Sequence, residues 1–157
     1  MRFYEGADGL KTGHTDNAGY CLAATAKRGD LRLIGIVLGE KDSKIRNSET
    51  MSLLDYGFNT VKMNKLISKD EVVKKISIDK ASDSELEVVL CDDLNILENK
   101  SSEKINYRFK YHINEINLPL KKGEVIGKVK VYNDKFIKSG NLCINKDINR
   151  LGFAHLY

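Results

Sequence analysis

Short segments with the residue pattern of β-strands make up most of this chain, and they constrain its fold more than any other feature. Residues 107–113 (Tyr-Arg-Phe-Lys-Tyr-His-Ile) place an aromatic or aliphatic side chain at every second position, with basic residues between. Residues 125–132 alternate in a similar way, and the Asn-Asp pair at 133–134 predicts a two-residue hairpin turn into a further strand. This spacing of strands and polar turns predicts a small all-β sandwich over residues 60–157.

The first part of the chain combines three more strand segments with a segment of helical period. The strands are expected at 9–15, 20–27 and 31–38, and their short connections favour an antiparallel meander. Residues 43–56 have helical spacing, and Gly57 is placed to close the helix in a left-handed conformation. The apolar face expected of this helix comprises Ile45, Met51, Leu54 and Phe58. The fold class is therefore α+β, and three strands with one helix are too few to cover both faces of their sheet.

Composition is that of a globular protein, since 41% of the residues are hydrophobic and 31% are charged. The net charge of +4 comes from single lysines spread along the chain. Such an excess indicates either an ordinary solvated surface or a surface with mild affinity for an anionic polymer. We expect no nucleic-acid partner, because no nucleic-acid-binding motif is recognised.

Cysteine and histidine spacing indicates no metal site. The three cysteines are widely separated and odd in number, so we expect small buried hydrophobic residues rather than a disulfide framework at Cys21, Cys91 and Cys143. The histidines are equally scattered, at His14, His112 and His155. No metal ion or other cofactor is expected.

The most specific motif has Lys11-Thr12-Gly13 as its kernel. Asp-Gly-Leu precedes it, and His-Thr-Asp-x-Ala-Gly-Tyr follows it. Lys-Thr-Gly is the third signature element of penicillin-binding proteins and serine β-lactamases. With these flanks the segment resembles the D-alanyl-D-alanine carboxypeptidases, the low-molecular-weight penicillin-binding proteins of the S11 peptidase family. The resemblance is strong to Phe58 and looser beyond it, where Pro-Leu-Lys-Lys-Gly-Glu-Val-Ile-Gly at 119–127 is similar to segments of the family's β-rich domain.

This resemblance implies a domain organisation and a reaction. Residues 1–59 would be the last antiparallel strands and C-terminal helix of a penicillin-binding/β-lactamase-like catalytic domain, and residues 60–157 the β-rich C-terminal domain. The family enzyme is a serine-type hydrolase that removes the terminal D-alanine from peptidoglycan pentapeptide through an acyl-serine intermediate, and it binds β-lactams. Its location would be extracytoplasmic, although we recognise no signal peptide at 1–6 and no membrane anchor at Leu156–Tyr157.

The residues that the resemblance implies for substrate binding are Lys11, Thr12, Gly13, His14 and Arg46. Lys11 would place a positive charge in the cleft, Thr12 would donate its hydroxyl to the substrate carboxylate, and Gly13 would allow close backbone approach. The backbone N–H of His14 would be an oxyanion donor, whereas its side chain is open between packing and catalysis. Arg46 is either directed at the substrate carboxylate or a solvent-facing helix residue.

The family's nucleophile motif is not expected within this sequence. Ser-x-x-Lys and Ser-x-Asn precede Lys-Thr-Gly in the family, whereas the matches at Ser77, Ser101 and 139–141 follow it, in the β-rich part. We interpret these as chance matches, expect no catalytic residue in this chain, and predict that the isolated chain is inactive. A non-catalytic cell-wall or protein docking module and an inert gene remnant are the alternatives. Exposed sheet edges and apolar faces would favour self-association.

Overall fold

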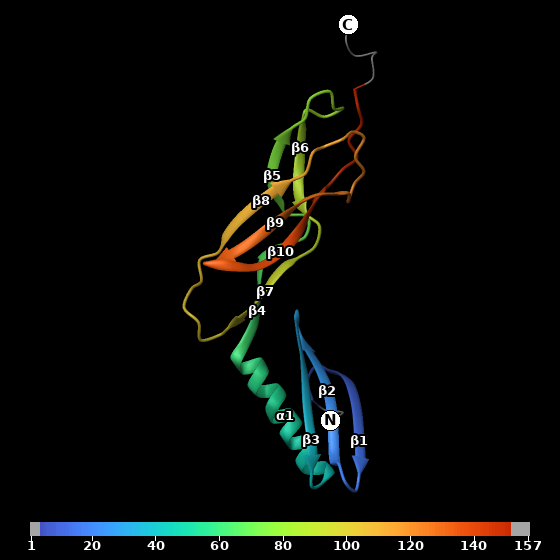
Figure 1. Ribbon diagram of the computed structural model, residues 1–157, viewed down its shortest axis with the longest axis vertical. Coiled ribbons are helices and arrows are strands. Elements are labelled where there is room, and N and C mark those ends of the chain that lie inside the picture. The colour runs from blue at the N-terminus through green and yellow to red at the C-terminus, as the bar shows by residue number, and fades with distance from the viewer. Residues whose placement is uncertain (1–3, 152–157) are drawn as a thin grey trace. The chain divides into compact units, whose positions relative to one another are not determined.

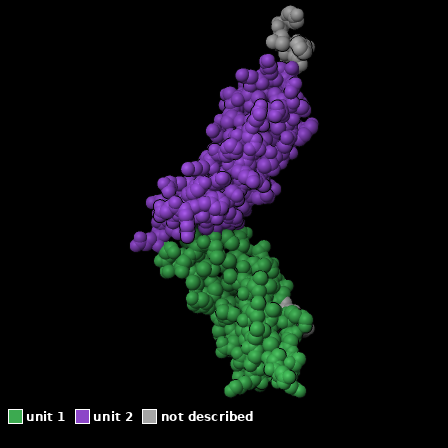
Figure 2. Space-filling model, viewed as in Figure 1, with its two compact units in different colours: residues 1–63, 97–102 green, residues 64–96, 103–157 purple. Residues whose placement is uncertain are grey.

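The structure, a computed structural model, describes residues 4–151 apart from the side chain of Leu10. Two compact units divide the chain. Unit 1 comprises residues 1–63 and 97–102, and unit 2 comprises residues 64–96 and 103–157 (Figure 2). The expectations for the chain ends, including His155 and the absence of an anchor at Leu156–Tyr157, lie outside the described residues.

Unit 1 contains an antiparallel meander and one helix, as expected from the sequence. Its strands β1 (Ala7–Thr15), β2 (Gly19–Arg28) and β3 (Leu31–Glu40) form a sheet in the order β1-β2-β3. Helix α1 (Ser43–Thr60) follows β3 and lies along one face of this sheet (Figure 1).

Helix α1 begins after Asp42, whose carboxylate accepts two backbone N–H groups of the first turn at 2.7 and 2.9 Å. It continues to Thr60, so the prediction that Gly57 closes the helix is wrong. A Cβ atom at Gly57 would lie 2.6 Å from Cδ1 of Leu33 in β3. Glycine is therefore used here for close approach of the helix to the sheet rather than for a left-handed end.

The buried face of α1 is narrower than predicted. Thr50, Leu54 and Phe58 are buried, at the regular spacing of four residues. The prediction that Ile45 and Met51 belong to the same face is wrong, because both side chains are exposed. A three-stranded sheet covers only one stripe of the helix, so apolar residues beside that stripe remain outside the core.

Unit 2 is built around a five-stranded antiparallel sheet of order β5-β6-β10-β9-β8. Its strands are β5 (Val72–Ser77), β6 (Glu85–Leu90), β8 (Arg108–Ile113), β9 (Val125–Asn133) and β10 (Lys135–Ile144). Strands β4 (Val61–Ile67) and β7 (Leu94–Asn99) form a separate pair, whose residues are divided between the two units. The mostly antiparallel sheets and one helix of residues 4–151 agree with the expected α+β class.

The core of unit 2 combines the inner face of the five-stranded sheet with residues from other segments. Fully buried positions on the sheet include Leu86, Val88, Leu90, Val129, Val131 and Leu142. The same cluster includes Ile67 of β4, Leu94 and Ile96 of β7, and the bridged pair Leu120 and Ile148.

The turn between β9 and β10 is tighter than predicted. Asn133 pairs with Lys135, so Asp134 alone lies between the strands, with φ of 57°. The prediction of a two-residue turn at 133–134 is therefore wrong by one residue. Aspartate is among the few residues that enter the left-handed region at modest cost, which permits this connection.

Cys91 and Cys143 form a disulfide, with a Cα–Cα distance of 5.2 Å. The expectation of three unlinked cysteines is thus wrong for these two, while Cys21 is a free, half-buried thiol. The bond joins positions 52 apart in sequence because β10 returns to pair with β6, and Cys91 directly follows β6. Strand pairing between distant segments brings the two sulfur atoms together, and sequence spacing alone does not reveal it.

Candidate functional site

The Lys-Thr-Gly segment lies on β1, an edge strand of the unit 1 sheet. Within the described residues β1 pairs only with β2, in a register that places Lys11 opposite Ala23 and Gly13 opposite Cys21. The backbone N–H and C=O groups along the outer edge of β1 have no strand partner in that sheet. Such an edge can pair with an extended peptide.

The predicted site residues are divided between the two faces of the unit 1 sheet. Paired residues lie on the same face, so Lys11 is grouped with Ala23 and, through it, with Ile36 of β3. Thr12 is opposite Leu22, a buried residue on the face covered by α1. All four residues from 11 to 14 are exposed, and the Lys11 ammonium donates to the backbone oxygen of Thr12 at 2.7 Å.

No packing constraint explains the glycine at position 13. A Cβ atom added there would meet only the Cβ of Cys21, at an ordinary contact distance of 3.9 Å. The backbone of Gly13 is also not left-handed. By contrast, a Cβ at Gly9 of the same strand would lie 2.3 Å from the hydroxyl oxygen of Thr25. A side chain at position 9 would therefore displace the Thr25 hydroxyl, whereas a side chain at position 13 would meet no such obstacle.

His14 packs against Tyr20, its partner across the β1–β2 pair. The ring centroids are 4.1 Å apart with an interplanar angle of 37°. This ring contact does not decide between packing and catalysis for the His14 side chain, so both alternatives stay open.

Asp8, near the start of β1, is held by two donors. The guanidinium of Arg32 and the hydroxyl of Thr25 both reach its Oδ1 atom, at 2.6 and 2.8 Å, and they lower the pKa of this carboxyl. The contacts link all three strands of the sheet close to the Lys-Thr-Gly segment.

Arg46 lies in the first turns of α1, where its guanidinium donates to Oδ1 of Asn47 at 2.9 and 3.2 Å. No hydrogen bond or ion pair joins it to Lys11, Thr12, Gly13 or His14 in the described part of the chain. Among the described residues the structure therefore shows no direct polar contact between Arg46 and the other predicted site residues, and its role stays a prediction.

The sheet face that carries Lys11 also carries exposed aliphatic residues. Ile34, Ile36 and Leu38 alternate along β3 and are 68%, 57% and 69% exposed. On the opposite face Leu22, Ala24 and Ala26 of β2 are buried against α1. An isolated globular unit rarely leaves such a row of large side chains in water.

The serines of the chance matches are not on a helix. Ser77 ends β5, Ser101 follows β7 and donates its hydroxyl to Oδ1 of Asn99 at 2.7 Å, and Ser139 is within β10. The helix described in residues 4–151 is α1, which contains none of these residues. No group of three or more His, Cys, Asp or Glu side chains in the same range is arranged to hold a metal ion.

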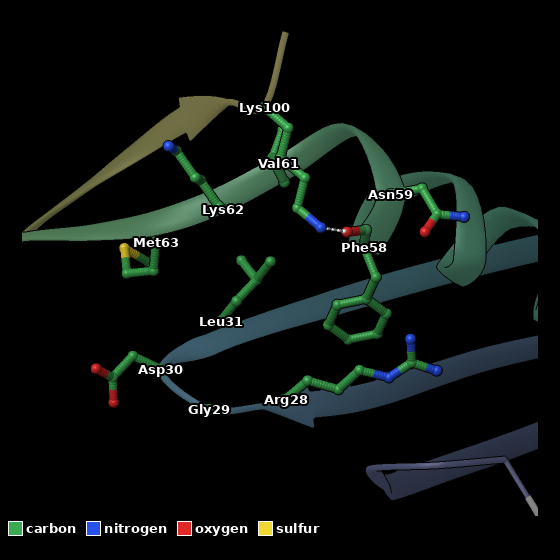
Figure 3. A pocket seen from close by; sticks show the side chains of 10 residues that line it. All are labelled: Arg28, Gly29, Asp30, Leu31, Phe58, Asn59, Val61, Lys62, Met63 and Lys100. Carbon is green, nitrogen blue, oxygen red and sulfur yellow. Dashed lines mark hydrogen bonds between the residues drawn. The ribbon is translucent and has the colours of Figure 1, made fainter. Parts of the chain in front are cut away.

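A pocket in unit 1 lies between the β2–β3 turn and the end of α1 (Figure 3). Arg28 stacks its guanidinium on the rings of Phe58 and Tyr4, at 4.3 and 5.1 Å, and pairs with Asp55 at 3.7 Å. Figure 3 shows the Lys100 ammonium directed at the backbone oxygen of Phe58, to which it donates at 2.7 Å. Both cations are therefore engaged in contacts within unit 1, and these contacts hold the end of α1.

Sequence comparison assigns both parts of the chain to one family. Residues 62–150 match a family described as "Penicillin-binding protein 5, C-terminal domain", and residues 2–42 match one described as "D-alanyl-D-alanine carboxypeptidase". The chain belongs to the D-alanyl-D-alanine carboxypeptidase family. It corresponds to the C-terminal portion of these proteins.

Relatives of this family match along nearly all of the chain. D-alanyl-D-alanine carboxypeptidase DacF of Bacillus subtilis is 28% identical over 98% of the chain and 40% of its own length. DacC of Escherichia coli is 34% identical over 93% of the chain and 37% of its own length. The solved penicillin-binding protein 5 of Haemophilus influenzae superposes with a TM-score of 0.71 and 32% identity, over 93% of the chain and 43% of the solved one. The chain thus spans about two fifths of these carboxypeptidases.

Proposed function

We propose that this chain forms one wall of the active site of a serine-type D-Ala-D-Ala carboxypeptidase, which removes the terminal D-alanine from peptidoglycan pentapeptide. In this proposal residues 1–59 belong to the catalytic domain and residues 60–157 are the family's β-rich domain. The observation that carries it is Gly13, a glycine without a packing reason on an exposed edge strand, between Thr12 and His14 in the family motif.

The chemistry assigns a role to each residue of this wall. An extended substrate pairs with the edge of β1, and the absence of a side chain at Gly13 lets it approach the backbone. The Lys11 ammonium and the Thr12 hydroxyl bind negative charge on the substrate, and the backbone N–H of His14 donates to the developing oxyanion. We retain Arg46 as a carboxylate-binding residue that acts only with segments beyond these 157 residues.

No catalytic residue is assigned to this chain, and we expect the isolated chain to be inactive and not acylated by β-lactams. The exposed row Ile34, Ile36 and Leu38 supports a missing partner for this sheet face, and it also favours self-association of the isolated chain. The disulfide supports an extracytoplasmic location, because disulfides persist mainly in oxidising compartments. No helix in the described part of the chain has the length and apolar character of a membrane span.

A chimera tests the proposal directly. The unmatched N-terminal part of B. subtilis DacF is fused to residues 1–157, and acylation by a penicillin is followed by intact-protein mass spectrometry. We expect one adduct, and we expect Lys11→Ala to slow acylation about 100-fold or more. Lys27→Ala, an exposed lysine of the same sheet, is the matched control and should leave the rate unchanged.

The isolated chain provides the complementary measurement. Incubated with the same penicillin, it should keep its mass. An adduct on Ser77, Ser101 or Ser102 would contradict the assignment of those serines as chance matches. A folded chimera, verified by circular dichroism, whose acylation is insensitive to Lys11→Ala would contradict the role given to the Lys-Thr-Gly wall.

A further inference from the structure

The outer face of strands β8 and β9 gathers basic side chains from two distant segments. Their register pairs Arg108 with Tyr132, Lys110 with Lys130, and His112 with Lys128. Because residues directly opposite each other share a face, these six side chains form one surface. The inner partners, such as Phe109 and Val131, belong to the core cluster of unit 2. We call the outer surface formed by these six residues the basic face. Figure 1 shows the two strands that carry it, β8 and β9, side by side.

Charge on the basic face is largely uncompensated. Within the described residues no carboxylate lies within 4.0 Å of the Lys110, Lys128 or Lys130 ammonium, and only Asp134 approaches Arg108, at 4.0 Å. Elsewhere in the sheet the pattern differs, since Lys75 of β5 pairs with Glu85 and Glu87 of β6 at 2.8 and 3.4 Å.

Two lysines directly opposite each other reduce stability. Like charges at paired positions of an antiparallel sheet repel, and Lys110 and Lys130 occupy such a pair. The Lys110 ammonium also lies 5.4 Å from the centre of the Tyr132 ring, which partly offsets the repulsion. An arrangement that costs folding energy and presents unpaired cations fits a surface for an anionic partner.

The geometry of the face suits an extended polymer. Alternate residues of a strand are about 6.6 Å apart, so two cations on β8 (Arg108 and Lys110) and two on β9 (Lys128 and Lys130) form two short parallel lines. Strand β10 adds neutral hydrogen-bonding groups beside them, because Ser139 pairs with Lys130 and Asn141 with Lys128. A chain with phosphodiesters at a similar spacing can meet each cation in turn.

We propose that the basic face binds a linear phosphodiester polymer of the cell envelope, with poly(glycerol phosphate) as its chemical type. The disulfide in the same unit supports an oxidising compartment, which favours an envelope polymer over nucleic acid. The proposal does not rest on carboxypeptidase activity and stands or falls separately from it.

A bilayer is the competing partner, because Phe136 and Ile137 are exposed near the β9–β10 turn. However, the basic face extends from Arg108 to His112, a distance of about 13 Å along the strand. That exceeds the screening length of roughly 8–10 Å in physiological salt, so a membrane reached by the turn would not engage Lys128. An extended polymer uses the whole face.

The test compares two triple variants of the full chain with the same net charge. Lys110→Gln/Lys128→Gln/Lys130→Gln removes the basic face, and Lys44→Gln/Lys74→Gln/Lys104→Gln removes three exposed lysines elsewhere. Binding of synthetic poly(glycerol phosphate) is measured by calorimetry at 50 and 200 mM salt (roughly bracketing physiological screening). We expect the first variant to bind about 100-fold more weakly, at about fivefold per lysine, and the second to bind nearly as wild type.

Thermal unfolding separates loss of binding from loss of folding. The basic-face variant should unfold at the same or a higher temperature than wild type, because the repulsion between Lys110 and Lys130 is removed. Equal loss of binding in both variants would show that only net charge matters and would overturn the proposal. The proposal would also fail if wild type bound phosphatidylglycerol vesicles but not the polymer. Binding to neither partner at about 50 mM salt, where contacts between cations and phosphates are strong, would overturn it as well.

Discussion

Removing the Cys91–Cys143 disulfide should strongly destabilise unit 2. The bond joins residues separated by 52 positions, and closing a loop of that length removes chain entropy from the unfolded state worth about 4 kcal/mol near room temperature. Cys143 is buried within β10, while Cys91 directly follows β6. The register of β10 on β6 already brings the two residues together, so the bond mainly restricts the unfolded chain.

The variant to test is Cys91→Ala/Cys143→Ala, unfolded in urea and followed by circular dichroism. With the slope of about 1–2 kcal/mol per molar expected for a unit of this size, the midpoint should fall by about 2–4 M. Wild type in reducing buffer should behave like the variant. Cys21→Ala is the control, because this thiol is unlinked and lies in unit 1, and its unit 2 transition should be unchanged.

Titration of the free thiols of the unreduced chain in denaturant tests directly whether the disulfide is formed. One reactive thiol per chain is expected, from Cys21. The reasoning would be refuted by three reactive thiols, or by an oxidised wild type that unfolds within about 0.5 kcal/mol of the double alanine variant.

Three further predictions concern packing, a helix end and pH. Gly127→Ala should lower the free energy of unfolding by about 3 kcal/mol in urea unfolding, because the added Cβ would lie 2.2 Å from the backbone oxygen of His112. Gly13→Ala is the matched variant and should change the unfolding midpoint little. Lys100→Met should destabilise unit 1 by about 1 kcal/mol in urea unfolding by removing the ammonium that donates to Phe58; no change would show that this bond is not formed in solution. The Lys65 ammonium and a backbone N–H lower the pKa of Asp93, so its stabilisation is present above about pH 4 and is lost as the pH falls through the folded-state pKa. In thermal melts Asp93→Asn should therefore lie below wild type at pH 6, and the difference should shrink as the pH is lowered below about 4; parallel curves would contradict this account.

Local patterns in the sequence predicted the individual elements of unit 1 well. The three strands and the helix correspond to β1–β3 and α1, because alternation and helical period are properties of neighbouring residues. The buried face of α1 was less predictable. Whether Met51 is covered depends on how far the sheet extends beneath the helix, and helical spacing does not contain that information.

Relations between distant segments account for the remaining differences. The disulfide follows from the pairing of β10 with β6, and the second line of the basic face appears only when β9 is aligned with β8. The Lys-Thr-Gly segment could be located from the sequence because its residues are consecutive. Arg46 could not be placed relative to it, since that relation depends on how α1 meets the sheet.

Lys100 illustrates a consequence for any attempt to divide the molecule. Residues 97–102 belong to unit 1 although they are flanked on both sides by unit 2, so the polypeptide passes between the units after positions 63, 96 and 102. A protease cut or gene truncation after Met63 would yield a first fragment without Lys100, which binds the end of α1. The second fragment would carry residues 97–102, which belong to unit 1. A chimera that exchanges either whole unit with that of another family member must therefore be joined after residues 63, 96 and 102.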